Sequence, residues 1–118
     1  MKPLMHAKNS AHKHGGKWED YLAIHDLMDS SKSAHSEMTH RAIFHSSFGI
    51  YIVEKIFGTT ITNSEGKLVS VRDIAEDHCI EDLGFIPSLD KWLKNIVFQD
   101  WMFGGRRKEI KTRFIKID

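Results

Sequence analysis

The chain has 118 residues, the size of one domain, and its 17 Lys and Arg residues nearly balance its 16 Asp and Glu residues. This balance gives no electrostatic reason to expect a nucleic-acid partner, and the single cysteine excludes an internal disulfide and the cysteine-rich zinc classes. Eight histidines are the unusual feature, because histidine is the commonest metal ligand and titrates near neutral pH.

The N-terminal residues 1–17 are polar and basic, contain three of the histidines, and end at Gly15–Gly16. This composition predicts a flexible arm. The segment lacks the apolar core of a signal peptide, and no apolar run in the chain reaches the roughly 18 residues of a transmembrane helix. We therefore expect a cytoplasmic protein with no membrane partner.

A helix is predicted over Trp18–Asp29, where apolar residues recur at helical spacing. This helix would place His25 and Asp29, which are four residues apart, on one face. A serine-rich link then leads to the most apolar part of the chain.

The segment Thr39–Gly58 has no proline, and its length suits a single helix that ends at Gly58. Because it is apolar on nearly all sides, we expect this helix to be buried. His40, Ser47 and Glu54 recur at steps of seven and form a polar line along it. A buried carboxylate such as that of Glu54 needs a cation, a histidine or a metal beside it.

The alternating pattern that follows Gly58 predicts a β-hairpin over 59–70, with a glycine in its turn. Ser70 and Asp73 then fit a capping box at the start of a helix that runs to Leu83. This helix places His78 and Asp82 four residues apart, as in the first predicted helix.

A last amphipathic helix is predicted from its cap at Ser88, with apolar residues at helical spacing as far as Val97. These elements predict a mainly α fold. Residues 18–105 would form one compact domain of about four helices that includes the small hairpin. The basic tail 106–118 would be a solvated end or add a strand. Together with the apolar Trp101–Phe103, it makes a homodimer reasonable.

Histidines and carboxylates on three helices could converge on one ion or a pair of ions. Mixed nitrogen and carboxylate ligation suits Zn²⁺, Mn²⁺ or Fe²⁺ better than Mg²⁺. The predicted metal ligands are His25, Asp29, His40, His78 and Asp82.

Other polar residues are assigned to catalysis or to ligand binding around this centre. Glu54 and Lys32 are the predicted catalytic residues. Glu54 would orient a ligand or act as a base, and Lys32 would hold phosphate. The residues predicted to bind phosphate or another ligand are Arg41, Arg72, His6 and His45. His45 is also interpreted as a core histidine. A buried network in which Arg41 and Arg72 pair with the acidic residues would explain the same positions without a metal, and both interpretations stay open.

Several short motifs form a recognisable pattern when they are taken together: Ile24–His25, Asp29–Lys32, His40–Arg41–Ala42 followed by His45, Glu54, Phe57–Gly58, Glu81–Gly84 and Ile86–Ser88. In this pattern the chain resembles an uncharacterised family of short phage and bacterial proteins over about residues 6–102. The resemblance implies no known activity. It implies a phage or prophage setting and singles out His6 within the arm. The sequence departs from the pattern at His14 and Ser46, where an aromatic residue and a second histidine are expected.

From these observations we expect a metal-dependent phosphohydrolase or nuclease-like protein, located in the host cytoplasm if it is phage-encoded. The alternative is a non-enzymatic phage accessory protein, which would use the same polar residues to bind a host protein or to sequester a nucleotide.

Overall fold

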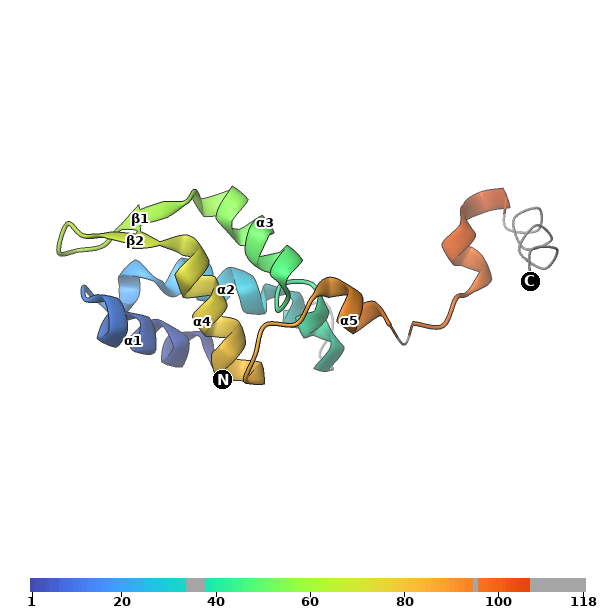
Figure 1. Cartoon of the computed structure of the whole chain (residues 1–118), viewed down its shortest axis with the longest axis horizontal. Helices are drawn as coiled ribbons and strands as arrows, with labels where there is room; N and C mark the ends of the chain where they lie inside the picture. The colour runs from blue at the N-terminus through green and yellow to red at the C-terminus, as the bar shows by residue number, and fades with distance from the viewer. Residues whose placement is uncertain (34–37, 95, 107–118) are drawn as a thin grey trace.

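The computed structural model describes residues 1–33, 38–94 and 96–106 and confirms a mainly α fold with one small hairpin (Figure 1). The α-helices of this described part are α1 (Pro3–His14), α2 (Leu22–Asp29), α3 (Ser47–Phe57), α4 (Val71–Leu83) and α5 (Leu89–Leu93). Its 3₁₀ helices are η1 (Trp18–Asp20), η2 (Ser30–Ser33), η3 (Met38–Ala42) and η4 (Asp100–Arg106).

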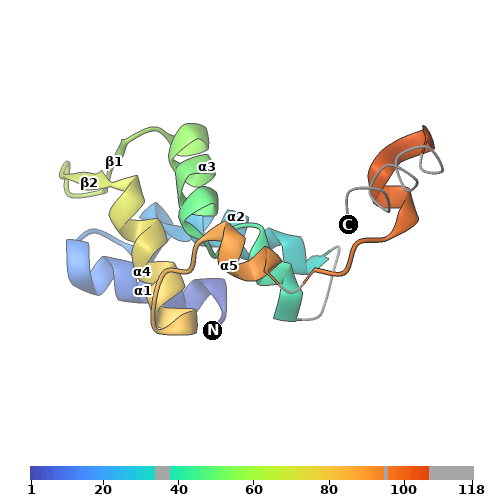
Figure 2. The ribbon, with the colours of Figure 1, turned by 45° about the vertical axis from the view of Figure 1, so that its right-hand side comes forward.

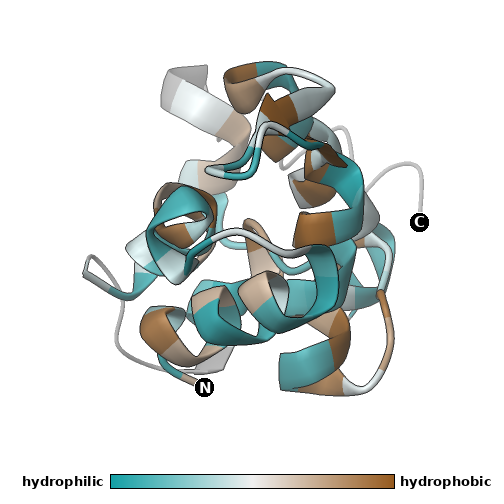
Figure 3. Cartoon of the chain, turned by 90° about the vertical axis from the view of Figure 1, so that its left-hand side faces the viewer, coloured by the Kyte–Doolittle hydropathy of each residue, from teal (hydrophilic) through white to brown (hydrophobic). Residues whose placement is uncertain are grey.

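Helix α2 lies at the centre of the body and contacts α1, α3 and α4 (Figure 2). Hydrophilic and hydrophobic residues alternate along the helices, as expected where each helix buries one face (Figure 3). The core is formed by Ala7, Tyr21, Ile24, Met28, Ile50, Val53, Val69, Val71, Ile74, Ala75 and Cys79. It therefore takes residues from all four longer helices.

The hairpin pairs β1 (Thr60–Thr62) with β2 (Leu68–Ser70) in antiparallel register, within the range 59–70 that the sequence predicts. Its turn is held by the side-chain oxygen of Asn63, which accepts hydrogen bonds from the backbone N–H groups of Glu65 and Lys67 at 3.0 Å. The amide of Asn63 also donates to the Tyr21 hydroxyl. These bonds join the hairpin to the helical body.

The prediction that residues 1–17 form a flexible arm is wrong, because α1 spans most of that segment and packs against α2 and α4. Pro3 occupies the first turn of α1, where its missing N–H has no cost, and Gly15 ends the helix with φ +86°. The helix is polar in composition because it buries only a narrow face, made of His6, Ala7 and Ser10.

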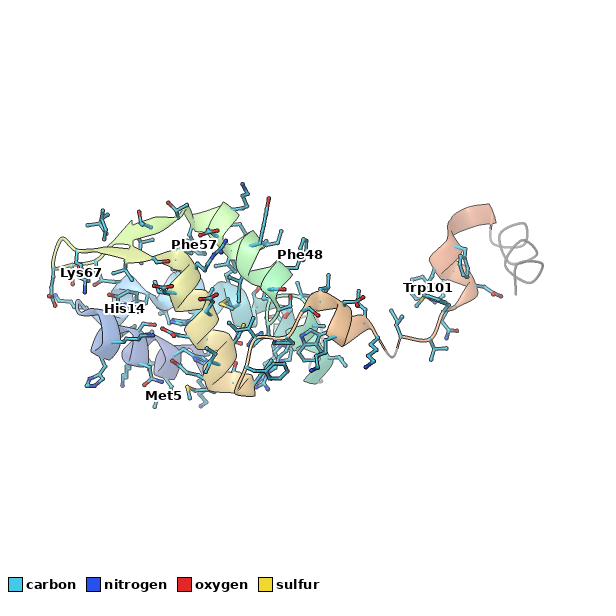
Figure 4. The ribbon with its side chains drawn as sticks, in the orientation of Figure 1. Met5, His14, Phe48, Phe57, Lys67 and Trp101 are labelled. Atoms are coloured by element: carbon cyan, nitrogen blue, oxygen red, sulfur yellow. The ribbon has the colours of Figure 1, made fainter. Side chains whose placement is uncertain are left out.

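The prediction of one buried helix over Thr39–Gly58 is also wrong in its extent. Ser46 adopts an extended conformation and caps α3 by accepting a hydrogen bond from the Gly49 N–H, so the helix begins only at Ser47. Helix α3 is also covered on one side only, because Phe48 and Ile56 are 53% and 58% exposed. Figure 4 shows Phe48 on the outer side of α3.

The C-terminal part differs from the sequence-based expectation in one respect. Ser88 caps α5 as predicted, but α5 ends at Leu93 rather than near Val97. Figures 1 and 4 show η4, with Trp101, lying away from the helical body. The tail beyond Arg106 and its predicted strand lie outside the described residues. None of the helices in the described part is long and apolar enough to cross a membrane.

Candidate metal centre

Buried histidines and carboxylates from distant parts of the sequence meet between the helices. Helix α2 supplies His25 and Asp29, and α4 supplies His78 and Asp82. Each of these pairs is spaced by four residues, so both members lie on one face of their helix. The loop before α3 supplies His45, and α1 adds His6. The four histidine side chains are completely buried.

Four side chains form what we call the ligand group: Asp29, His45, His78 and Asp82. The Asp82 Oδ2 atom lies 2.8 Å from His45 Nε2 and 3.4 Å from His78 Nε2. The Asp29 Oδ1 atom lies 3.2 Å from His78 Nε2 and 3.6 Å from His45 Nε2. An ion bound tetrahedrally at about 2.0–2.1 Å has ligand atoms about 3.3–3.4 Å apart, and three of these four spacings lie close to that value. The fourth, between His45 Nε2 and Asp82 Oδ2, is a hydrogen-bond distance and would have to widen on metal binding.

Two polar atoms of the ligand group are buried without a hydrogen-bond partner: Asp29 Oδ2 and His45 Nδ1. Buried polar atoms are normally paired, so such atoms call for an explanation. A bound ion in the ligand group would explain Asp29 Oδ2 but not His45 Nδ1, because the ligand-facing nitrogen of His45 is Nε2. The backbone around His45 is fixed, because its carbonyl accepts a hydrogen bond of 2.9 Å from Trp92 Nε1.

The electrostatics of the ligand group favour ionised carboxylates. Burial acts to raise the pKa of Asp82, but hydrogen bonds from His78 and His45 outweigh it and hold that pKa well below its usual value. The pKa of Asp29 is lowered in the same way, with burial opposed by the hydrogen bond from His78. Burial also opposes protonation of His78, but its hydrogen bonds to the two carboxylates raise its pKa. The two carboxylates are therefore ionised, which is the form that binds a metal ion.

Three nearly parallel imidazole rings lie beside the ligand group, and we call them the histidine stack: His6, His25 and His78. The rings of His6 and His78 stack with centroids 3.7 Å apart, and those of His25 and His78 are tilted by only 19°. His25 Nδ1 lies 2.8 Å from His78 Nδ1. His6 joins the stack to α4 through Glu81, at 2.7 Å, and Asp82, at 3.1 Å. These three rings are also close enough to be considered as ligands of an ion.

The buried histidines predict that the metal-free protein loses stability in acid. Burial, with the charges of His78 and His6, lowers the pKa of His25 to about 3, and burial lowers the pKa of His45 to about 4. Below pH 6.5 the unfolded chain therefore binds protons at these two rings that the folded protein does not bind. His78 contributes the opposite sign, because its raised pKa stabilises the folded state below pH 6.5.

His6, whose pKa burial also lowers, acts in the same direction as His25 and His45, and His78 offsets only part of their effect. The free energy of unfolding should therefore fall by about 3 kcal/mol between pH 7 and pH 5. Urea titrations of chelator-treated protein at the two pH values would measure this change. The fall should be smaller in a His45→Asn variant, which lacks one of these rings. A free energy that stays constant over this range would contradict the buried neutral histidines.

A cavity of about 210 Å³ opens beside the ligand group. It is lined by Met1, Lys2, Pro3, Asp29, Lys32, His40 and Arg41. Asp29 belongs both to the ligand group and to the cavity wall, so it connects the two. The three cationic side chains, Lys2, Lys32 and Arg41, suit an anionic ligand.

Most of the predicted metal ligands are brought together. His25, Asp29, His78 and Asp82 all meet at the centre, whereas His40 lies on η3, outside the ligand group, and lines the cavity. Lys32 and Arg41, predicted to hold phosphate, line the same cavity.

Glu54 and Arg72 are not part of this site, which corrects their predicted roles as base and phosphate ligand. They form an ion pair of 3.0 Å in which the Arg72 side chain is 57% exposed. The reason is the break at Ser46, which removes the predicted polar line through His40, Ser47 and Glu54. Glu54 instead faces the first turn of α4.

The sequence alone gives His6 and His45 only a minor predicted role and does not identify Ser10. His6 and Ser10 are four residues apart, as are the histidine–aspartate pairs of α2 and α4, and Pro3 and Gly15 are helix-boundary signals that enclose them. These signals could have identified α1. No comparable signal places His45, because its position depends on the break before α3.

One family model, described as "Domain of unknown function (DUF6915)", matches residues 1–102 of the chain. The match covers α1 to α5 and therefore all the residues of the centre and of the cavity. Comparison with curated proteins and with solved structures finds no match.

Proposed function

The chain belongs to the DUF6915 family, whose domain has no known function, and we propose that this member is a metal-dependent phosphohydrolase. The observation that carries the proposal is the position of Asp29. Its carboxylate belongs to the metal-sized ligand group and also forms part of the wall of a cavity lined by Lys2, Lys32 and Arg41. A phosphate group in that cavity would lie beside the ion.

The ligand group supplies two imidazole nitrogens and two carboxylates. This mixture favours Zn²⁺, Mn²⁺ or Fe²⁺ over Mg²⁺, which prefers oxygen ligands and keeps several waters. The unpartnered Asp29 Oδ2 is a further oxygen that could bind the ion. A bound ion of this kind lowers the pKa of water and polarises a phosphoryl oxygen.

The residues of the cavity have separate roles in this proposal. Lys32 and Arg41 bind the substrate phosphate and neutralise charge that develops during its transfer to water. His40 lies on the same wall, and its ring centroid is 6.4 Å from that of His45. His40 is the imidazole outside the ligand group that could donate a proton to the leaving oxygen.

The first test is hydrolysis of p-nitrophenyl phosphate and bis(p-nitrophenyl) phosphate by untagged protein, with metal content measured by mass spectrometry. We expect one equivalent of transition metal per chain, and phosphatase activity that a chelator removes and added metal restores. A Lys32→Ala variant should raise KM about tenfold with its metal content unchanged, because it removes one phosphate contact.

Lys13→Ala is a matched control, because this lysine pairs with Asp77 on the surface at 2.8 Å and lies outside the cavity. It should leave KM unchanged. Failure to retain or take up any transition metal would exclude the proposal. Metal binding with tight, unproductive binding of phosphate compounds would favour the sequestering role instead.

A further inference from the structure

We propose that Ser10 and His25 are positioning residues that orient His78 through a hydrogen-bonded chain, and that His25 is not a ligand of a second metal ion. This inference rests on the proposed metal centre. It assigns a role to α1, because that helix supplies the outer end of the chain.

The hydrogen-bonded chain of side chains is continuous from α1 to the ligand group. Ser10 Oγ lies 2.7 Å from His25 Nε2, and His25 Nδ1 lies 2.8 Å from His78 Nδ1. The other nitrogen of His78, Nε2, faces the carboxylates of the ligand group. All three side chains are at least 97% buried, so solvent does not compete for these bonds.

The positions of the protons follow from the acceptors. When an ion occupies the lone pair of His78 Nε2, the ring carries its proton on Nδ1, and this Nδ1–H donates to His25 Nδ1 at 2.8 Å. His25 then carries its proton on Nε2 and donates it to Ser10 Oγ. A ligating histidine usually donates its second N–H to a fixed acceptor, which sets both its tautomer and the direction of its ring.

The geometry of the histidine stack disfavours a second ion between its rings. The lone pairs of an imidazole lie in the plane of the ring, so the stacked rings of His6 and His78, with centroids 3.7 Å apart, direct them side by side rather than toward a common point. Each ring nitrogen of the stack also has a hydrogen-bond or ion-pair partner. The ligand group, in contrast, leaves one carboxylate oxygen, Asp29 Oδ2, without one.

The test is a Co²⁺ titration of full-length apoprotein, followed by its visible absorption bands. Wild-type protein should bind one equivalent. His25→Leu should weaken binding about 10–100-fold and alter the bands without changing the stoichiometry. His25→Asn should recover most of the affinity, because its Oδ1 atom stands close to the position of His25 Nδ1 and can accept from His78.

Ser10→Ala removes the outer end of the chain without removing an imidazole, and it should weaken Co²⁺ binding less than His25→Leu does. Asn63→Ala is the control for general destabilisation, because Asn63 holds the hairpin turn and makes no hydrogen bond to Ser10, His25 or His78. This variant should bind Co²⁺ like the wild type. Long-range ¹H–¹⁵N spectra of the Zn²⁺-loaded protein should show protons on His78 Nδ1 and His25 Nε2.

Each result separates the two proposals. Two equivalents in the wild type that fall to one in His25→Leu would overturn the positioning role and make His25 a ligand. One equivalent with unchanged affinity in both His25→Leu and Ser10→Ala would overturn the positioning role alone. No binding by the wild type would overturn the metal centre, and the positioning role with it.

Discussion

An Asp82→Asn variant is expected to lose stoichiometric metal binding and, with it, all metal-dependent phosphatase activity. Asp82 is the most highly connected carboxylate of the centre. Its Oδ2 atom faces His45 and His78, and its Oδ1 atom lies 3.1 Å from both His6 and the α-amino group of Met1. An amide keeps the size of the side chain but removes the negative charge that a divalent cation requires.

The affinity should fall by more than the roughly 100-fold that loss of an outer hydrogen-bond partner can cost. Metal content after gel filtration and a Co²⁺ titration would measure it. Asp77→Asn changes another acidic residue of α4, one that pairs with Lys13 outside the ligand group, and should bind metal normally. If Asp82→Asn retained wild-type affinity while staying folded, the proposed ligand group would be wrong.

A Gly49→Ala variant is expected to destabilise the protein by about 2 kcal/mol or more. A β-carbon at this position would overlap the backbone of Phe44, so α3 or the loop before it would have to move. In an unrestricted helix the same substitution would stabilise by up to about 1 kcal/mol, so the overlap decides the sign. The same loop carries His45, so metal affinity should fall as well.

Urea denaturation of the metal-free protein measures the first effect, because an apoprotein titration excludes any contribution from bound metal. Ser47→Ala alters an exposed residue in the same first turn of α3 and should change the free energy of unfolding by less than about 0.5 kcal/mol. Equal stabilities of Gly49→Ala and the wild type would show that the loop adapts without strain.

The parts of the fold that depend on local sequence could be predicted. The hairpin follows from the turn at Asn63–Gly66, and the start of α4 follows from the cap at Ser70, whose hydroxyl accepts from the Asp73 N–H. The pairs His25/Asp29 and His78/Asp82 were identified because residues four apart share a helix face whatever surrounds the helix. The prediction that these two pairs meet at one centre is also confirmed, whereas the third helix contributes neither His40 nor Glu54 to the ligand group.

The parts that depend on tertiary contacts could not be predicted in the same way. Serine is compatible with a helix interior as well as with an N-cap, so Ser46 alone does not fix the start of α3. The close approach of Gly49 to the backbone of Phe44, which leaves no room for a β-carbon, is visible only in the folded structure. If residues 39–58 formed a single long helix, His45 would project among the apolar residues of that helix. Helix α1 was missed because a narrow buried face in a polar segment gives a weak amphipathic signal.

The distribution of the ligand group along the chain has a consequence for the lifetime of the folded protein. Asp29 and His45 are separated by 16 positions, and His45 and His78 by 33. An ion held by all of them would close these loops as a cross-link does, and an unfolded chain could offer only the local pair on α4. Metal at 1,000 times its Kd would add about 4 kcal/mol to folding. The supply of metal would then control how long each molecule survives proteolysis, as well as whether it is active.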